Sequence, residues 1–180
     1  MYDKAHIGKK IATGGVRKVY MYETDHVIKI SSPFLGVKLR NKLGHDYLVC
    51  KKYFPAFVVE TIDVTPTSER THVEIQPFIP GERLRKHHLR NEKTRLQLLE
   101  IQNGIERMEA DGYPPIDLIG NGGILSECLS NIIVDTEGNL NIVDAAILEA
   151  KTVRPIGIFL ELLMPFAKAR QKKLLNRFLK

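Results

Sequence analysis

The sequence predicts an α+β fold with two lobes, in which an antiparallel sheet is followed by a smaller, mostly helical part. Three observations favour it: short β-type segments separated by turn residues over 7–30, helical spacing of apolar residues over 35–53, and a hairpin pattern over 131–143. A chain of 180 residues is within the usual length of one domain. We therefore expect a single domain with an N-terminal lobe over 1–80 and a reduced C-terminal lobe over 81–180.

Five strands are expected in the first half of the chain. Three of them form a meander, in which Gly14-Gly15 and a polar turn at 24–26 separate short β-branched segments. The five expected strands lie around Ile11 and at 19–22, 27–30, 57–62 and 72–78. A helix over 35–53 should stand between the third and fourth strands, because its apolar residues recur every three or four positions.

The second half is expected to contain two helices with a β-hairpin between them. Asn91 can cap the first helix, and Gly112 can end it in a left-handed conformation. The hairpin follows at 131–143, where two apolar strands flank a polar turn. A final amphipathic helix begins near Ile156 and becomes strongly basic. Four of its apolar residues are expected to complete the core: Phe159, Leu162, Leu163 and Phe166.

Charge and cysteine content narrow the class of protein. The net charge of +6 could attract nucleic acid, anionic lipid or a nucleotide, and much of the excess lies in 83–90 and 168–180. The basic final helix is therefore a candidate surface for an anionic partner. Cys50 and Cys128 lie far apart in the sequence, so neither a disulfide framework nor a zinc site is expected. No signal peptide or transmembrane segment is recognisable, and we expect a cytoplasmic protein.

A glycine-containing loop between the first two strands is the first candidate binding feature. The string IATGGVRKVY places Thr13, Gly14 and Gly15 at this loop. Small residues at such a loop let backbone N–H groups approach phosphate oxygens. An ordinary hairpin turn would use the same residues, so the loop alone does not identify a nucleotide site.

The third strand carries the lysine that such a loop requires. Val27 and Lys29 share one face, because alternate residues of a strand point to the same side. Val27 could cover an adenine ring while Lys29 reaches the α- and β-phosphates, which leaves Ile28 and Ile30 for the core. The alternative is a lysine at a strand end, exposed to water.

Asn131 and Asp144 form the second candidate feature. They stand at the two ends of the expected hairpin, thirteen positions apart by subtraction (144 − 131). One amide oxygen and one carboxylate held on neighbouring strand ends can bind the Mg²⁺ that bridges nucleotide phosphates. Asp144 also follows an apolar run, where a carboxylate is costly unless a cation meets it. Its alternative role is to cap the next turn.

The order of these motifs resembles that of the protein-kinase-like fold. More narrowly, the strings TGGVRKVY…VIKI, VVET, SNII and RPIG…KARQKKLLNRF are similar to the bacterial PhoP-regulatory-network protein YrbL family. The resemblance implies a minimal two-lobed kinase-like fold that binds ATP and Mg²⁺. It implies a phosphotransferase that acts on a hydroxyl group of an unknown protein or small-molecule acceptor. The alternative is a pseudokinase, a binding module regulated by nucleotide, because few residues follow Asp144.

Two residues compete for the role of catalytic base. Five positions before Asn131, where a kinase loop keeps its aspartate, the sequence has Ser126, which cannot act as that base. The segment MEADGYPPIDL, which follows the preceding helix, instead places Asp117 at the aspartate position, with about nine residues inserted before the metal ligand. Glu127 is a third, weaker candidate.

A carboxylate partner for Lys29 is not obvious in the sequence. Kinases pair this lysine with a glutamate of the following helix. Asp46 is the only carboxylate between Asp25 and Glu60, and its side chain is one methylene shorter. Either the helix packs closer, or Lys29 is oriented by Asp144 and phosphate.

Overall fold

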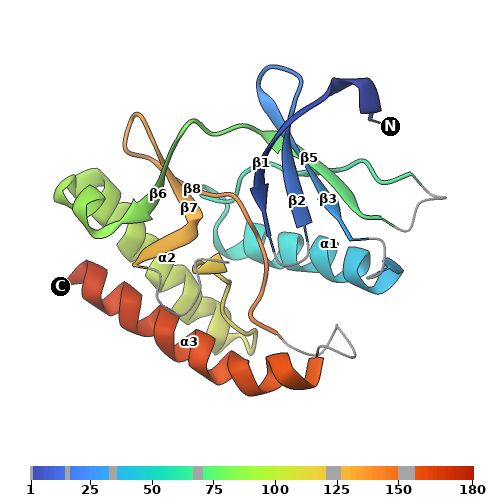
Figure 1. Ribbon diagram of the computed structural model, residues 1–180. Coiled ribbons are helices and arrows are strands. Elements are labelled where there is room, and N and C mark those ends of the chain that lie inside the picture. Colours follow the sequence, from blue (N-terminus) through green and yellow to red (C-terminus); the bar gives the residue numbers. More distant parts are fainter. Residues whose placement is uncertain (1, 15–16, 33–35, 67–70, 121–126, 150–156) are drawn as a thin grey trace. The chain divides into compact units, whose positions relative to one another are not determined.

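The computed structural model describes residues 2–14, 17–32, 36–66, 71–120, 127–149 and 157–180 (Figure 1). Within these residues the α+β class is confirmed, with one antiparallel sheet of five strands, a second sheet of three strands and three α-helices. The chain forms two compact units. Unit 1 is Met1–Gly44 with Val59–Phe78, and unit 2 is His45–Val58 with Ile79–Lys180.

Unit 1 contains the five-stranded sheet, ordered β1-β2-β3-β5-β4. Its strands are β1 (Ile7–Thr13), β2 (Arg17–Tyr22), β3 (His26–Ser31), β4 (Ile62–Asp63) and β5 (Val73–Pro77), and the 3₁₀ turn η1 (Lys4–His6) precedes them. The predicted meander and the strand expected at 72–78 are therefore confirmed. One face of the sheet is apolar, because Tyr22, Ile28 and Val73 are buried together there and Ile30 packs against them. This confirms the core role expected for Ile28 and Ile30.

The strand expected at 57–62 is wrong for most of its length. Only Ile62–Asp63 pairs as β4, and Val58 makes a single bridge to Ile142 in unit 2. Phe57 and Val58 are buried in the apolar core of unit 2. Their hydrophobic character therefore reflects burial in a core, which a short apolar run does not distinguish from a strand.

Unit 2 contains the three-stranded antiparallel sheet β6-β7-β8 and two long helices. The elements are β6 (Gly81–Arg85), the 3₁₀ helix η3 (Lys86–Arg90), α2 (Glu92–Ala110), β7 (Cys128–Asp135), β8 (Leu140–Ile142) and α3 (Gly157–Leu179). Helix α1 (Gly36–Tyr53) begins in unit 1 and ends in unit 2. The expected hairpin and the helices are confirmed. Asn91 caps α2, since its side chain accepts the Thr94 N–H, and Gly112 has a φ of 85°.

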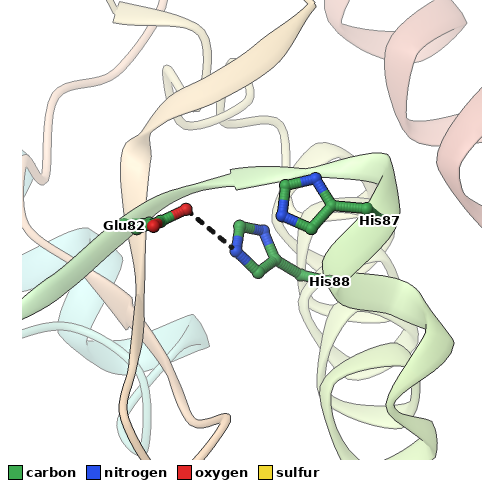
Figure 2. A group of neighbouring side chains, drawn as sticks. All are labelled: Glu82, His87 and His88. Atoms are coloured by element: carbon green, nitrogen blue, oxygen red, sulfur yellow. Dashed lines mark ion pairs between the residues drawn. The ribbon is translucent and has the colours of Figure 1, made fainter.

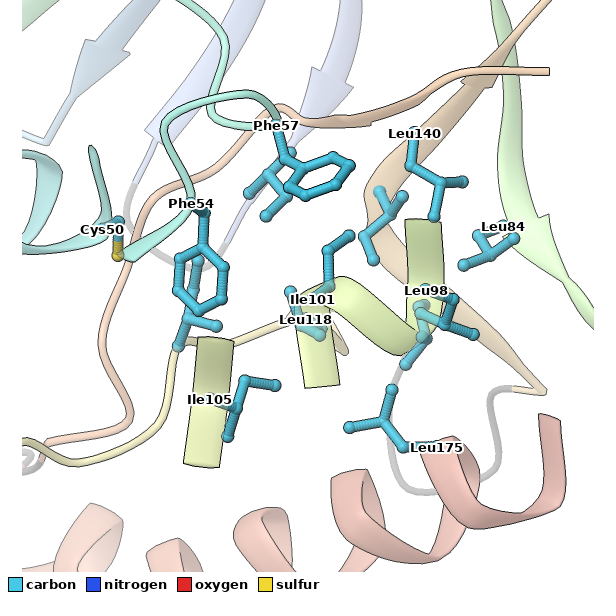
Figure 3. Packing of buried hydrophobic residues seen from close by; sticks show 14 of the residues in the cluster. Cys50, Phe54, Phe57, Leu84, Leu98, Ile101, Ile105, Leu118, Leu140 and Leu175 are labelled. Atoms are coloured by element: carbon cyan, nitrogen blue, oxygen red, sulfur yellow. The ribbon is translucent and has the colours of Figure 1, made fainter. Parts of the chain in front are cut away.

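The core of unit 2 joins α1, α2, α3 and the small sheet (Figure 3). Phe54, Leu98 and Ile101 lie at its centre and are almost fully buried. Gly104 of α2 faces the Phe54 ring so closely that a Cβ there would lie 2.5 Å from Cε1 of the ring. The helix-weakening glycine therefore makes room for a large aromatic side chain.

The basic run 83–90 spans a strand and a 3₁₀ helix, and the last helix differs from expectation in part. The run begins in β6, which pairs with β7 and whose Leu84 is buried, and it continues through η3. Phe166 is 71% exposed and does not belong to the core, so that expectation is wrong. The side chains of Phe159, Leu162 and Leu163 lie outside the described residues. Three residues about two to three turns after Phe166 are buried instead: Leu174, Leu175 and Phe178. None of the described helices combines the length and hydrophobicity needed to cross a membrane.

Candidate functional site

The face of the unit 1 sheet opposite its apolar face is buried but polar. Antiparallel pairing places Lys29 directly across from Glu74, and Arg17 across from Ser31. Six polar or charged side chains of this face are each less than a tenth exposed: Arg17, Lys29, Ser31, His72, Glu74 and Gln76. We call these six residues the charged face. Burying a charged group costs free energy unless it is paired with an opposite charge or hydrogen-bonded. A sheet face that buries several charged groups is therefore a candidate functional site.

Glu74 is the centre of the charged face. Its carboxylate accepts hydrogen bonds from Nη1 of Arg17 at 2.7 Å and from Nε2 of His72 at 2.9 Å. Burial favours the neutral acid, but the His72 hydrogen bond and the charges of Arg17, Lys29 and His72 outweigh it and lower the pKa of Glu74 to about 2. Glu74 is therefore a carboxylate at any physiological pH.

The network around Glu74 continues through His72 to the edge of the same unit. The backbone N–H of His72 donates to Oγ of Ser31 at 2.7 Å, and Nδ1 of its ring lies 3.8 Å from a carboxylate oxygen of Asp63. Asp63 in turn accepts a hydrogen bond from Nε of Arg40 at 3.0 Å. A chain of polar side chains therefore links β2, β5 and β4 and reaches α1.

The nucleotide-binding residues expected in unit 1 lie as the strand pattern predicts. Val27 and Lys29 share the face opposite Ile28, and both are buried. Thr13 ends β1, and Gly14 closes the turn with a hydrogen bond from its N–H to the Arg17 carbonyl at 2.6 Å. Gly15 lies outside the described residues.

Three site residues from separate segments of unit 2 lie together. Nδ2 of Asn131 donates to the Asp117 carbonyl at 2.8 Å, and the Val143 N–H donates to the Asn131 carbonyl at 3.0 Å. Asp117 also donates its N–H to the Ala146 carbonyl at 2.7 Å, and Asp144 is close enough to affect the Asp117 carboxyl electrostatically. We call Asp117, Asn131 and Asp144 the acidic group.

The Asp117 carboxyl is held by the backbone that follows it. Its Oδ1 accepts the N–H groups of Ile119 at 3.0 Å and Gly120 at 2.9 Å. Burial raises the pKa of Asp117 above its ordinary value, and the charge of Asp144 raises it further, while the two N–H groups oppose this shift. Gly120 is required here, since its φ is 59° and a Cβ would lie 2.3 Å from Oδ1 of Asn131.

The acidic group offers the donors that a hard cation prefers. Because Nδ2 of Asn131 donates to the main chain, its Oδ1 is the atom of the amide left as a ligand. Together with the carboxylate oxygens of Asp144, it makes an all-oxygen donor set, which suits Mg²⁺. These residues therefore fit the metal that the sequence predicts.

The other candidates for the base role have different surroundings. Ser126 lies outside the described residues. Glu127 is exposed, and its carboxylate accepts a hydrogen bond from Nη1 of Arg177 at 3.1 Å. Asp46, the short carboxylate considered as a partner for Lys29, is buried in unit 2 and accepts the Ile147 N–H at 3.0 Å. Of the two candidates for the base that the structure describes, Asp117 and Glu127, Asp117 is the one hydrogen-bonded to Asn131 through its carbonyl.

A second group of metal-ligand types, Glu82, His87 and His88, is better explained as a helix cap (Figure 2). Nδ1 of His88 accepts the Arg85 N–H at 3.0 Å, which caps the start of η3. A neutral His88 must then carry its proton on Nε2, the atom that faces Glu82 at 3.6 Å. A metal at Nε2 would require that proton to move and the cap to break, so His88 acts as a cap whose Nε2 lies near the Glu82 carboxylate.

Sequence reasoning missed Glu74, His72 and the buried role of Arg17. The available signal was polar residues alternating with apolar ones at 72–76, which marks a strand with two different faces. Pairing with β3 could not be read from that pattern. No protein-family model matches this chain and no curated protein matches it, so the functional assignment rests on the residues and contacts described above.

Proposed function

We propose that this protein binds ATP with Mg²⁺ in a minimal kinase-like fold, related to the YrbL family, and transfers the γ-phosphoryl group to a hydroxyl acceptor. One observation carries the proposal. Asp117, Asn131 and Asp144 were selected from three sequence segments by their motif positions, and they belong to one hydrogen-bonded and electrostatically coupled group in unit 2.

The residues of unit 1 would bind the nucleotide. Backbone N–H groups of the loop at Thr13, Gly14 and Gly15 would contact phosphate oxygens, and Lys29 would bind the α- and β-phosphates. Val27 would cover the adenine. The support for these roles is that Lys29 and Val27 lie on one face and that Glu74 keeps this face charged.

The residues of unit 2 would bind the metal and accept the proton of the acceptor hydroxyl. Asn131 and Asp144 would supply oxygen ligands, and Asp117 would accept the proton of the attacking hydroxyl. Bound Mg²⁺ would neutralise phosphate charge. In the reaction the acceptor oxygen bonds to the γ-phosphorus, the bond to the β–γ bridging oxygen breaks, and the hydroxyl proton moves to the Asp117 carboxylate. The raised pKa of Asp117 supports this role, because a stronger base accepts that proton more readily.

A pseudokinase is the second candidate, and the two N–H bonds to Asp117 favour it. A carboxylate bound by the N–H groups of the next two or three residues is a common structural turn, which needs no catalytic role. In this case nucleotide binding would regulate contact with another protein, and no phosphate would be transferred.

Calorimetric titration with Mg·ATP tests the shared part of both candidates. Asp144→Ala should weaken binding by tenfold or more, while Glu137→Gln, an exposed control in the β7–β8 turn, should not change it. Absence of binding by the natural sequence, or equal binding by Asp144→Ala, would exclude the proposal.

Transfer of labelled γ-phosphate separates the two candidates. The phosphotransferase predicts incorporation, into the protein itself or into a lysate component, that is lost in Asp117→Asn although this variant still binds Mg·ATP. Binding without transfer in the natural sequence and the variant alike would leave the pseudokinase.

A further inference from the structure

We infer that Glu74 positions Lys29, the proposed phosphate-binding cation of unit 1, and so replaces the helix glutamate that the sequence lacks. This inference rests on the proposed nucleotide site and assigns it a positioning residue. Through Arg17, the same carboxylate also anchors the end of the glycine loop.

The register of the sheet places Lys29 next to Glu74. Lys29 and Glu74 are directly opposed on β3 and β5, so their side chains leave the same face of the sheet at neighbouring positions. Both are at least nine-tenths buried, and the charge of Lys29 helps to keep the Glu74 carboxylate ionised. The reciprocal effect must exist: the Glu74 charge stabilises the Lys29 ammonium.

The second contact ties the glycine loop to the same carboxylate. Arg17 is the first residue of β2, and Gly14 bonds to its carbonyl across the loop. Its guanidinium binds Glu74 at 2.7 Å and is buried. The far end of the loop is therefore anchored to β5 through a charged hydrogen bond.

The position of Glu74 on a strand would affect how the protein is regulated. A glutamate on a helix can move toward or away from its lysine, which is how many kinases are switched. Glu74 is on a paired strand of the same sheet as Lys29. The lysine is therefore oriented before nucleotide binds, and no helix movement is required to activate it.

A pH profile of nucleotide binding tests this positioning role. The groups that face Glu74 and Lys29 are Arg17 on β2 and His72, which directly precedes β5, with Asp63 on β4 and Arg40 on α1 behind His72. Between about pH 7.5 and 9.5 the arginines stay charged and the carboxylates stay ionised. A pH effect in this window that Lys29→Arg removes therefore reports on Lys29.

The natural sequence should bind Mg·ATP with nearly constant affinity across that window. Glu74→Gln should bind about tenfold more weakly at its lower end and progressively worse as pH rises, because loss of the Glu74 charge lets the buried Lys29 ammonium lose its proton more easily. Lys29→Arg combined with Glu74→Gln should restore a flat profile, since arginine remains charged. Glu23→Gln, an exposed glutamate of the same unit, should behave as the natural sequence.

Each outcome has one meaning. A flat profile for Glu74→Gln, or an equal slope in the double variant, overturns the positioning role while the proposed function stands. Failure of the natural sequence to bind Mg·ATP overturns the function itself and the inference with it. If Glu74→Gln does not fold, Glu74→Asp keeps the charge but withdraws it by one methylene. Its affinity should fall several-fold, and unchanged affinity overturns the inference.

Discussion

The charged face of unit 1 and the acidic group of unit 2 are held in place by different kinds of partner. Glu74 is bound by the side chains of Arg17 and His72, and all three depend on one another's charge. Asp117 is bound by backbone N–H groups of Ile119 and Gly120, which remain whatever side chain is present. Replacing the Glu74 side chain should therefore change stability strongly. Replacing the Asp117 side chain should change chemistry with little cost to folding.

Removing the Glu74 carboxylate should have the largest effect. Glu74→Ala leaves Arg17 and Lys29 buried without this partner, and breaking a buried ion pair from one side costs about 3–5 kcal/mol of the free energy of unfolding. Urea denaturation measures the loss. Glu137→Gln, on the surface of unit 2, should stay within about 0.5 kcal/mol of the natural sequence. A loss as small as that control would mean that the charged face does not depend on Glu74.

Acid should weaken the same contacts. The pKa of Glu74 is lowered from 4.5 to about 2, so the folded protein binds this proton less tightly than the unfolded chain. Its contribution, about 3 kcal/mol at roughly 1.4 kcal/mol per pH unit, is present above the unfolded value and lost as pH falls through the folded one. Unfolding free energies measured from about pH 6 to about pH 2 should therefore fall more steeply for the natural sequence than for Glu74→Gln. Parallel curves would contradict the contrast between the two units.

A matched pair of glycines tests how the acidic group is built. Gly112 and Gly120 both have positive φ values, 85° and 59°, but a Cβ at 112 meets nothing within 4 Å, whereas one at 120 would overlap Oδ1 of Asn131. Gly112→Ala should cost about 1–2 kcal/mol of backbone strain. Gly120→Ala should cost about 1–3 kcal/mol more, because Asn131 must move, and it should also weaken metal-dependent nucleotide binding. Equal losses would show that Asn131 adjusts freely.

Replacing Asp117 should have the smallest effect on stability, and in the opposite direction. Because the pKa of Asp117 is raised, the folded state binds this proton more tightly than the unfolded chain, and the contribution of Asp117 to stability falls as pH rises through the folded pKa. Asp117→Asn should therefore gain about 1 kcal/mol or less at neutral pH, a gain that disappears in acid. Thermal unfolding at both pH values measures it. A stability loss at neutral pH would show that the negative charge itself is needed for folding.

Local patterns predicted those elements whose periodicity is unambiguous. The meander, α1, the capped helix α2 and the β7–β8 hairpin follow from alternation, from spacing of three or four, and from glycine and asparagine at their ends. The failures are of one kind. Phe57 and Val58 were expected in a strand but are core residues, while the strand at 81–85, which pairs with β7, was not predicted. In each case the deciding partner is remote in sequence.

The residues of the candidate site likewise divide into those that the sequence predicted and those that only the fold identified. The sequence alone selected Lys29, Asn131, Asp144 and Asp117, because their chemistry and their positions in local motifs can be read without the fold. The structure corrects one detail, since Asn131 lies inside β7 and not at the end of the hairpin. The sequence left Asp117 and Ser126 as competing bases, and only the fold placed Asp117 beside Asn131. Glu74 had no distinguishing motif at all. Its importance comes from strand pairing across 45 positions (74 − 29), and the register of such pairing is set by the burial of whole faces.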